Sequence, residues 1–303
     1  MSPAAAIRED PMSKKSNIIT TIIFTIILLV GLSVMLYPVV SNWWNNRVMS
    51  RAVADYNETV REIDTSKADA MVAEAQAYNE KIARLEAPLI NYEDIQGYED
   101  VLDITGTGIM GYITIPVIQV EIPIYHGTSS EVLNSAAGHI QGSSLPVGGI
   151  NTHSVISAHR GLPSAKLFSD LDQLVVGDTF TVTVLNNVYT YEVEEILIVL
   201  PEEMDKLAIY PGKDYVTLMT CTPYGVNTHR LLLRSHRIET KYQSTVRANA
   251  DAMQVDPMVV VPVFAAPLVV MLIIFWTITG KKSKKKLPYD VRKYQLKSKR
   301  LTK

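Results

Sequence analysis

The sequence predicts a mainly-β external domain, a barrel or sandwich, preceded by helices and flanked by two transmembrane helices. Three observations support this fold class. Two long apolar stretches contain no charged residue, and residues 46–86 have helical spacing and many Ala, Glu, Arg and Lys. After Pro88, short segments alternate between apolar and polar residues, as strands do. With 303 residues, the chain has room for one well-packed domain besides these additions.

The two apolar stretches are residues 18–40, with 23 uncharged residues, and residues 258–279, with 22. At about 1.5 Å per residue, each can cross a hydrocarbon core about 30 Å thick. Pro262 and Pro267 in the second stretch are tolerated better in membrane helices than in soluble ones. A cleaved signal peptide is the alternative for the first stretch, but its apolar region usually has about 7 to 15 residues. We therefore expect an uncleaved anchor and two spans.

Basic residues beside the spans predict their orientation. Residues 281–303 carry 11 Lys and Arg and one acid, a net charge of +10 that suits the anionic cytoplasmic leaflet. Residues 1–17 carry a net charge of +1. Because the whole chain has a net charge of −2, the part between these two segments carries −13. The sequence thus predicts a cell-membrane protein with a cytoplasmic N-terminus (1–17), a basic cytoplasmic tail (280–303) and an acidic extracellular part, which argues against a nucleic-acid partner.

Residues 41–86 contain no Gly or Pro and are predicted to be a helical N-terminal region. Asp64-Thr65-Ser66 is the expected break, and it supplies a cap for a second helix. The apolar positions recur at helical spacing over a few turns: Val53, Tyr56, Val60 and Ile63. A stripe this short favours two helices packed on the domain over a solvated coiled coil.

The predicted barrel or sandwich occupies residues 109–240, between a lid-like segment or linker at 87–108 and a linker at 241–257. The segments that read as strands are 109–116, 120–127, 153–160, 178–185, 188–196, 215–221 and 230–238. Two of them join at Asn186-Asn187, residues that accept the positive φ of a tight hairpin turn. Short strands with only small helical insertions, such as 164–174, are typical of these two architectures.

Cys221 is the only cysteine in the chain, and it ends an apolar predicted strand, where its side chain would lie at the rim of a barrel. A nucleophilic thiol needs a base or a positive group to lower its pKa from about 8.5, and acyl transfer needs donors for an oxyanion. If residues 221–229 form a connecting loop, Arg230 begins the next strand and returns beside Cys221. A buried, inert thiol is the alternative interpretation.

Six histidines compete for the role of the base. His159 ends a predicted strand and precedes a Gly-Pro turn, so it has the same kind of rim position as Cys221. The residues alone favour His159, and they leave open the other five: His126, His139, His153, His229 and His236.

Four segments together resemble the sortases, in particular the class C, pilin-polymerising group. They are "GYITIP…IPIYHGTS", "GHIQGSSLPVGG", "THSVISAHRGLPSAKLFSDLDQL" and "PGKDYVTLMTCTPYGVNTHRLLLR", which follow the family's order over residues 109–238. The resemblance implies a closed eight-stranded β-barrel that carries a cysteine transpeptidase and needs no cofactor or metal. In that transpeptidase, Cys221 would be the nucleophile, His159 the acid/base, and Arg230 the group that holds the substrate and stabilises the oxyanion.

The implied substrate is a Leu-Pro-x-Thr-Gly-like sorting signal cleaved between Thr and Gly, and the implied acceptor is a lysine amine of a pilin subunit. A housekeeping-type sortase that anchors surface proteins to peptidoglycan is the alternative. Two further hypotheses are a hydrolase that transfers the acyl group to water and a non-catalytic assembly factor built on the same barrel. The assembly factor is disfavoured because the Cys, His and Arg are all present.

One departure from the class C pattern concerns the lid. Many members carry an Asp-Pro-aromatic motif there, whereas this chain has Ala87-Pro88-Leu89. Ala87 cannot form the charge-assisted contact that a carboxylate could make with Arg230. We therefore expect a weakly held or open lid, with Leu89 or Tyr92 as a poorer plug, or a mere linker at 87–108.

Overall fold

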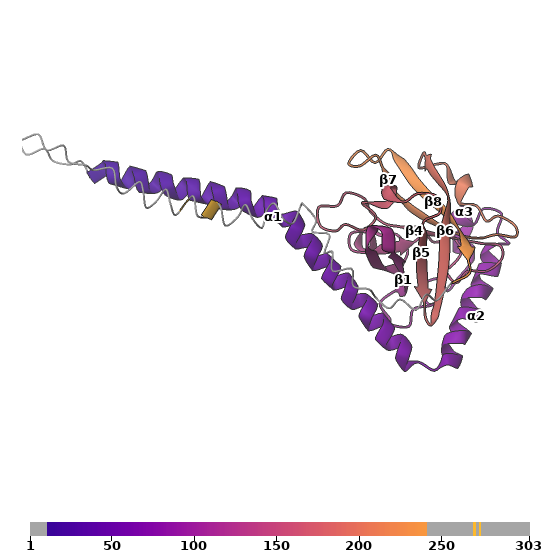
Figure 1. Cartoon of the computed structure of the whole chain (residues 1–303). Helices are drawn as coiled ribbons and strands as arrows, with labels where there is room; N and C mark the ends of the chain where they lie inside the picture. The colour runs from indigo at the N-terminus through magenta and orange to yellow at the C-terminus, as the bar shows by residue number, and fades with distance from the viewer. Residues whose placement is uncertain (1–10, 241–268, 271–272, 274–303) are drawn as a thin grey trace, which may run out of the picture. The chain divides into compact units, whose positions relative to one another are not determined.

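The computed structural model describes residues 11–240 and, from a later segment, residues 269, 270 and 273 (Figure 1). The predicted linker, second span and basic tail lie outside the described residues, except for these three positions. The chain divides into two units, and one of them, Leu36–Ala250, contains the barrel. The other includes the chain up to Met35 and from Asp251 onward.

One long helix, α1 (Pro11–Glu62), runs through the first predicted span and into the predicted helical region. Among the described residues, Ile22–Glu62 is the single helical stretch long and apolar enough to cross a membrane. No side chain in the most apolar part of this stretch is buried; Ile23 and Leu29, for example, are 51% and 55% exposed. Such a helix suits a membrane anchor, and a signal sequence has the same composition.

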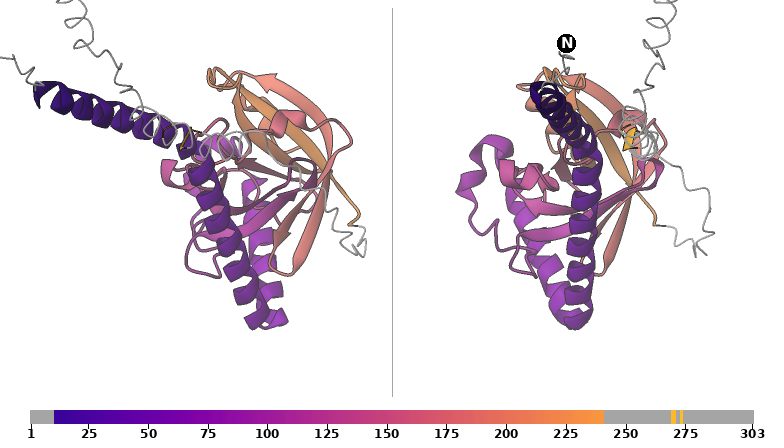
Figure 2. Two further views of the ribbon diagram at one scale, coloured as in Figure 1. Left: turned by 60° about the vertical axis from the view of Figure 1, so that its left-hand side comes forward. Right: turned by 90° about the vertical axis from the view of Figure 1, so that its left-hand side faces the viewer.

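The predicted break between two helices is confirmed. The second helix, α2 (Thr65–Ile82), begins after Asp64, whose side chain accepts a hydrogen bond from the Ser66 amide at 3.1 Å. Figure 2 shows the end of α1 and the whole of α2 against the barrel. The Tyr56 hydroxyl from α1 donates to the Met110 carbonyl and accepts from the Leu185 amide, so this helix is fixed to two strand ends. Packing on the domain, rather than a free coiled coil, is therefore confirmed.

Eight strands form the closed barrel. They are β1 (Ile109–Ile115), β2 (Val120–His126), β3 (Ala137–His139), β4 (Thr152–Ser157), β5 (Thr179–Val184), β6 (Asn187–Val199), β7 (Asp214–Thr222) and β8 (His229–Ile238). Their order around the barrel is β1-β2-β3-β4-β7-β8-β6-β5, and β5 pairs with β1 to close it. The closed eight-stranded fold is confirmed, although residue patterns alone did not identify β3.

The remaining helices within residues 11–240 are short. They are α3 (Pro88–Asn91), α4 (Ser130–Leu133) and four 3-10 turns, η1 (Tyr92–Asp94), η2 (Pro116–Ile118), η3 (Leu171–Gln173) and η4 (Met204–Leu207). The helical insertion expected at 164–174 is therefore only one 3-10 turn near its end.

Two registers bring distant residues to one end of the barrel. Strands β4 and β7 are parallel, with Ser157 opposite Met219, so both strands finish at the same end. Strands β7 and β8 are antiparallel, so β8 begins at that end. Figure 1 shows the three strands side by side. The barrel end formed by the last residues of β4 and β7 and the first residues of β8 is called the rim below.

The strand predicted at 153–160 was too long, because β4 ends at Ser157. After it, the His159 carbonyl accepts a hydrogen bond from the Phe168 amide at 3.2 Å instead of one from a neighbouring strand. The chain turns at Gly161, where φ is +77°, in the left-handed region that favours glycine. His159 therefore lies in a loop that starts at the rim.

Apolar side chains occupy both faces of the sheet near the rim. The barrel interior includes Val216, Leu218 and Leu231, all nearly inaccessible. A second cluster on the outer face, called the outer cluster, consists of Val155, Val199, Leu207 and Leu232, with Leu89, Ile140, Leu197 and Met219 packed against it. Because side chains alternate along a strand, Met219 and Cys221 lie on the same outer face of β7.

Two histidines are buried inside hydrogen-bond networks. His139 contacts the Tyr98 hydroxyl through Nδ1 at 2.9 Å and the Ser144 carbonyl through Nε2 at 2.8 Å. His153 contacts the Ala208 carbonyl and the Thr217 hydroxyl, each at 2.7 Å. Burial disfavours the imidazolium and lowers the pKa of each from 6.5 to about 4, so both are neutral at pH 7.

These two histidines predict acid sensitivity of the fold. Between pH 6.5 and about 4 the unfolded chain protonates both imidazoles while the folded chain does not, so the free energy of unfolding falls as the pH falls. Each pKa shift corresponds to about 3 kcal/mol once the pH is below 4. Urea unfolding followed by tyrosine near-UV circular dichroism should show a lower midpoint at pH 5 than at pH 7. Equal midpoints would contradict the prediction, and pH 8 against pH 9 is the control because both histidines are neutral there in the folded and the unfolded chain.

Candidate active site

Cys221 and Arg230 form a directly opposed pair across β7 and β8. Side chains of opposed residues project to the same face, with Cβ atoms about 5 Å apart. Both residues are partly buried, so solvent reaches them. The Arg230 guanidinium donates to the Asn227 and His229 carbonyls at 3.3 and 3.2 Å, which holds it over the turn between the two strands. The expected connecting loop and the return of Arg230 beside Cys221 are both present.

His159 follows the end of β4 at the same rim. It follows Ser157 by two residues, just as Cys221 follows Met219, the partner of Ser157 in the parallel ladder. The alignment continues beyond the ladder, because the Ala158 amide donates to the Met219 carbonyl at 3.2 Å and the Thr220 hydroxyl donates to the Ala158 carbonyl at 2.8 Å. The sulfur, imidazole and guanidinium therefore come from three neighbouring chain segments at one rim.

Arg160, which the sequence analysis did not single out, connects the two loops at the rim. Its guanidinium pairs with Asp172 at 2.5 Å and donates to the Thr222 hydroxyl at 3.3 Å. It also lies 5.9 Å from the centre of the Tyr224 ring. Arg160 follows His159 and Thr222 follows Cys221, so this contact ties together the residues next to the two candidate catalytic groups.

The glycine of this turn is required by the same packing. A Cβ atom at Gly161 would lie 3.0 Å from the Tyr224 ring, closer than such contacts normally are. Combined with its positive φ, this close approach disfavours any side chain at this position. The loop after His159 and the loop after Cys221 therefore fit against each other.

The other histidines are placed away from the thiol or are engaged in structural contacts. His139 and His153 are the buried pair described above, and His126 bonds the Gly108 and Val101 carbonyls. His236 pairs with Glu194 near the opposite end of β8. Only His229 shares the rim with His159, and it contacts the Thr228 hydroxyl at 2.9 Å.

The predicted lid segment, 87–108, is anchored to the domain at its later part. Tyr98, Val101 and Leu102 are buried in the main core, and the Tyr98 hydroxyl contacts His139. Ala87, Pro88 and Leu89 are partly buried, and Ala87 precedes the single turn of α3. A Cβ atom at Gly142 would lie 2.5 Å from the Pro88 carbonyl oxygen, so the backbones touch there.

Leu89 packs against the outer cluster, as does Met219, which lies two residues before Cys221 on the same face. We predict that this contact slows access to the thiol modestly. Leu89→Ala should raise the rate of Cys221 alkylation by iodoacetamide by roughly fivefold, the effect of about 1 kcal/mol of lost half-buried contact. Ile90→Ala is the matched control, because Ile90 is 69% exposed.

Equal alkylation rates for wild type, Leu89→Ala and Ile90→Ala would show that this segment does not shield the thiol. Point substitution is preferable to deleting residues 87–100, because deletion also removes Tyr98 from the core.

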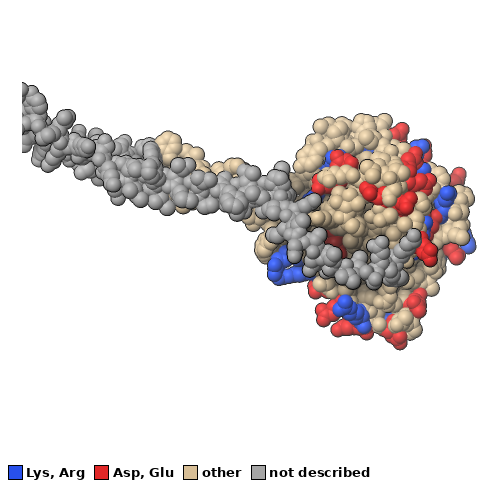
Figure 3. All heavy atoms as spheres, in the orientation of Figure 1, with Lys and Arg blue, Asp and Glu red and all other residues tan. Residues whose placement is uncertain are grey.

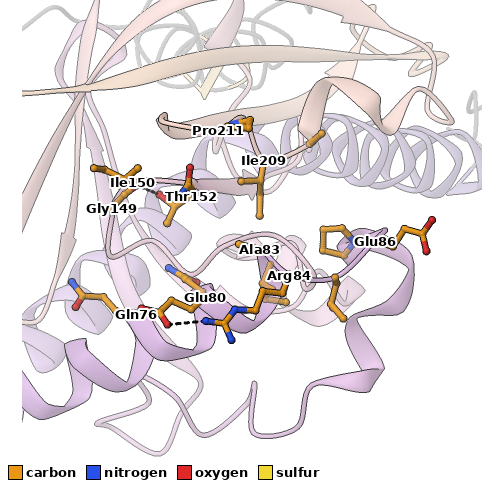
Figure 4. Close-up of a pocket in the computed structure, with 17 residues that line it drawn as sticks. Gln76, Glu80, Ala83, Arg84, Glu86, Gly149, Ile150, Thr152, Ile209 and Pro211 are labelled. Atoms are coloured by element: carbon orange, nitrogen blue, oxygen red, sulfur yellow. Dashed lines mark hydrogen bonds and ion pairs between the residues drawn. The ribbon is translucent and has the colours of Figure 1, made fainter.

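A pocket of about 880 Å³ lies elsewhere (Figure 4). Its walls are the end of α2, with the Glu80–Arg84 ion pair, and the loops around Ile150 and Pro211 that precede β4 and β7. It is therefore at the opposite end of these strands from Cys221. Among the described residues, no group of three or more His, Cys, Asp or Glu side chains is arranged to hold a metal ion.

Comparison with known proteins identifies the family. Residues 113–238 match the family described as Sortase domain. The crystal structure of sortase C1 from Streptococcus agalactiae is 48% identical, covers 63% of this chain and 100% of that chain, and has a TM-score of 0.59. Sortase C from Streptococcus pneumoniae is 42% identical over 63% of this chain and 97% of that chain, with a TM-score of 0.57.

Among curated proteins, sortase A of Streptococcus agalactiae serotype III is 33% identical over 140 residues, 45% of this chain. The match spans 56% of that relative, so a little over half of its length is represented. The fold, the matched domain and the full coverage of the sortase C1 structure lead to one conclusion: this chain belongs to the sortase family, and the solved structures it resembles are class C sortases.

Proposed function

We propose that the protein is a membrane-anchored cysteine transpeptidase that joins pilin subunits. It would cleave an LPxTG-like sorting signal between Thr and Gly and transfer the threonyl acyl group to a lysine amine of the next subunit. The catalytic domain would be extracellular, with two spans and both termini cytoplasmic.

In the first half-reaction, the Cys221 thiolate attacks the threonine carbonyl carbon, and the Arg230 guanidinium donates to the resulting oxyanion. The C–N bond then breaks, and His159 as imidazolium gives its proton to the departing glycine amine. The product is a thioester on Cys221 and a neutral His159.

In the second half-reaction, the lysine amine attacks the thioester carbonyl and His159 takes the proton that the amine loses. The C–S bond breaks, which restores the thiolate and leaves an isopeptide bond. The net charge of −13 outside the predicted cytoplasmic segments favours the approach of a cationic acceptor. Figure 3 shows acidic side chains spread over one face of the domain, with basic ones between them.

One observation carries this proposal: Cys221 and Arg230 are opposed across β7 and β8, and His159 comes two residues after the end of β4, the strand that pairs in parallel with β7. Three side chains that acyl transfer requires thus share one solvent-accessible rim.

Pilin joining is preferred to peptidoglycan anchoring because the resembling structures are sortases C, one described as belonging to a pilus island and another by its pilin substrate specificity. Anchoring to peptidoglycan is the second candidate, favoured by the similarity to proteins named sortase A.

The test is to incubate the protein with a labelled LPxTG peptide and one of two acceptors, a pilin-like lysine peptide or an oligoglycine peptidoglycan mimic. Mass spectrometry should detect an acyl adduct on Cys221 and an isopeptide product with the lysine acceptor. Product only with the mimic would favour anchoring, product only with water would indicate a hydrolase, and no adduct would refute the transpeptidase.

A further inference from the structure

The face of α1 that packs on the barrel has two asparagines at the end nearest the predicted membrane span. The positions on this face follow one another at three- or four-residue spacing: Asn42, Asn45, Met49, Val53, Tyr56 and Val60. The last four are buried and apolar, whereas the first two are partly buried amides. Polar residues at the start of an otherwise apolar stripe call for specific partners.

Both asparagines bond to the backbone of the loop that follows His159. The Asn42 side-chain oxygen accepts from the Lys166 amide at 2.8 Å. The Asn45 side-chain nitrogen donates to the Ser164 carbonyl at 2.8 Å. The two bonds connect residues more than a hundred positions apart in the sequence.

This loop in turn holds His159. The Phe168 amide, two residues after Lys166, donates to the His159 carbonyl, and Phe168 itself is fully buried. The Gly161 amide donates to the Ser169 hydroxyl at 3.1 Å. After Ser157, the last ladder residue of β4, these contacts and those of Arg160 hold the backbone that carries the imidazole. A displacement of about 1 Å at a reacting group can cost a hundredfold in rate.

We propose that Asn42 and Asn45 are positioning residues, through which the membrane-proximal end of α1 sets the place of the His159 loop. They stand two and five residues after Val40, the last residue of the predicted first span. Anchoring and catalysis are then linked through one helix. This inference rests on the proposed transpeptidase function.

The two asparagines use opposite halves of their amides, which provides a sharp test in the full-length protein in lipid nanodiscs. Asn42→Asp keeps the acceptor oxygen for Lys166, whereas Asn45→Asp replaces the donor to Ser164 with a carboxylate facing a carbonyl. We expect kcat near wild type for Asn42→Asp and a loss of about tenfold for Asn45→Asp and for the Asn42→Ala/Asn45→Ala double variant. The KM for the peptide should stay within about twofold in all three. Asn46→Ala, at an exposed neighbour, is the matched control.

Hydrogen exchange provides a second readout that does not depend on activity. In the double variant, amides of residues 161–168 should exchange faster while those of β7 keep their protection. Unchanged exchange and unchanged kcat would overturn the proposal, and so would loss of protection throughout β7, which would indicate general unfolding. If the wild type shows no transfer, the proposed function fails, and exchange alone then decides whether the asparagines hold the loop.

Discussion

Cys221→Ala should form neither the acyl adduct nor the isopeptide product, because no other residue at the rim supplies a sulfur nucleophile. The chain contains one cysteine, so the thioester has no alternative site. The expected loss is complete within detection, at least a thousandfold, since binding and oxyanion donors alone cannot replace the covalent step. Intact-mass spectrometry after incubation with the sorting-signal peptide measures the adduct, and gel analysis of pilin conjugates measures the product.

The matched control is Val226→Ala, in the turn that follows Cys221, where the side chain is 66% exposed. This variant should retain adduct and product, which shows that a small change in the loop is tolerated. Undiminished isopeptide product from Cys221→Ala would contradict the covalent mechanism.

His159→Ala should slow both half-reactions by roughly a hundredfold to ten-thousandfold, the usual contribution of a general acid and base. The leaving glycine amine then departs without a proton donor, and the incoming lysine amine keeps its proton. Rates of adduct formation and of adduct transfer, measured separately with the same peptide, report the two steps. The peptide's affinity should change little because His159 acts on transferred protons.

His229→Ala is the control for this prediction, because His229 occupies the same rim opposite Thr222. It bonds a neighbouring hydroxyl, and its removal should change either rate by less than about twofold. A large loss of rate in His229→Ala together with normal rates in His159→Ala would show that His229, and not His159, transfers the protons.

Local pattern predicted much of the barrel. Alternation in Phe180, Val182 and Val184 identified β5, and a tight turn does join it to β6. The turn expected at Asn186-Asn187 was one residue off, because Asn187 already pairs with Val184 and the positive φ is at Leu185. Strand β3 was missed from the residues because it has only three, Ala137–His139, too few to show a period. The strand predicted at 153–160 was too long for a similar reason. The His159 carbonyl bonds the Phe168 amide of the following loop, and this contact depends on the packing of the loop and not on local propensity.

The members of the candidate site could be proposed from the sequence, but the residues that support them could not. A thiol at a strand end and an arginine after a turn indicate proximity by themselves, and the family resemblance selected His159 among six histidines. The parallel pairing of β4 with β7 joins segments about sixty residues apart, which no periodicity reports. For the same reason, Arg160, Asn42 and Asn45 could not be recognised, because their partners become visible only in three dimensions.

The most direct measurement is an experimental structure of the protein with Cys221 covalently joined to a mimic of the sorting signal. Our account predicts the His159 imidazole and the Arg230 guanidinium within hydrogen-bond distance of the bound threonine's acyl group or the amine position next to it. A structure with either group turned to the other side of the barrel, away from the thioester carbon, would contradict it.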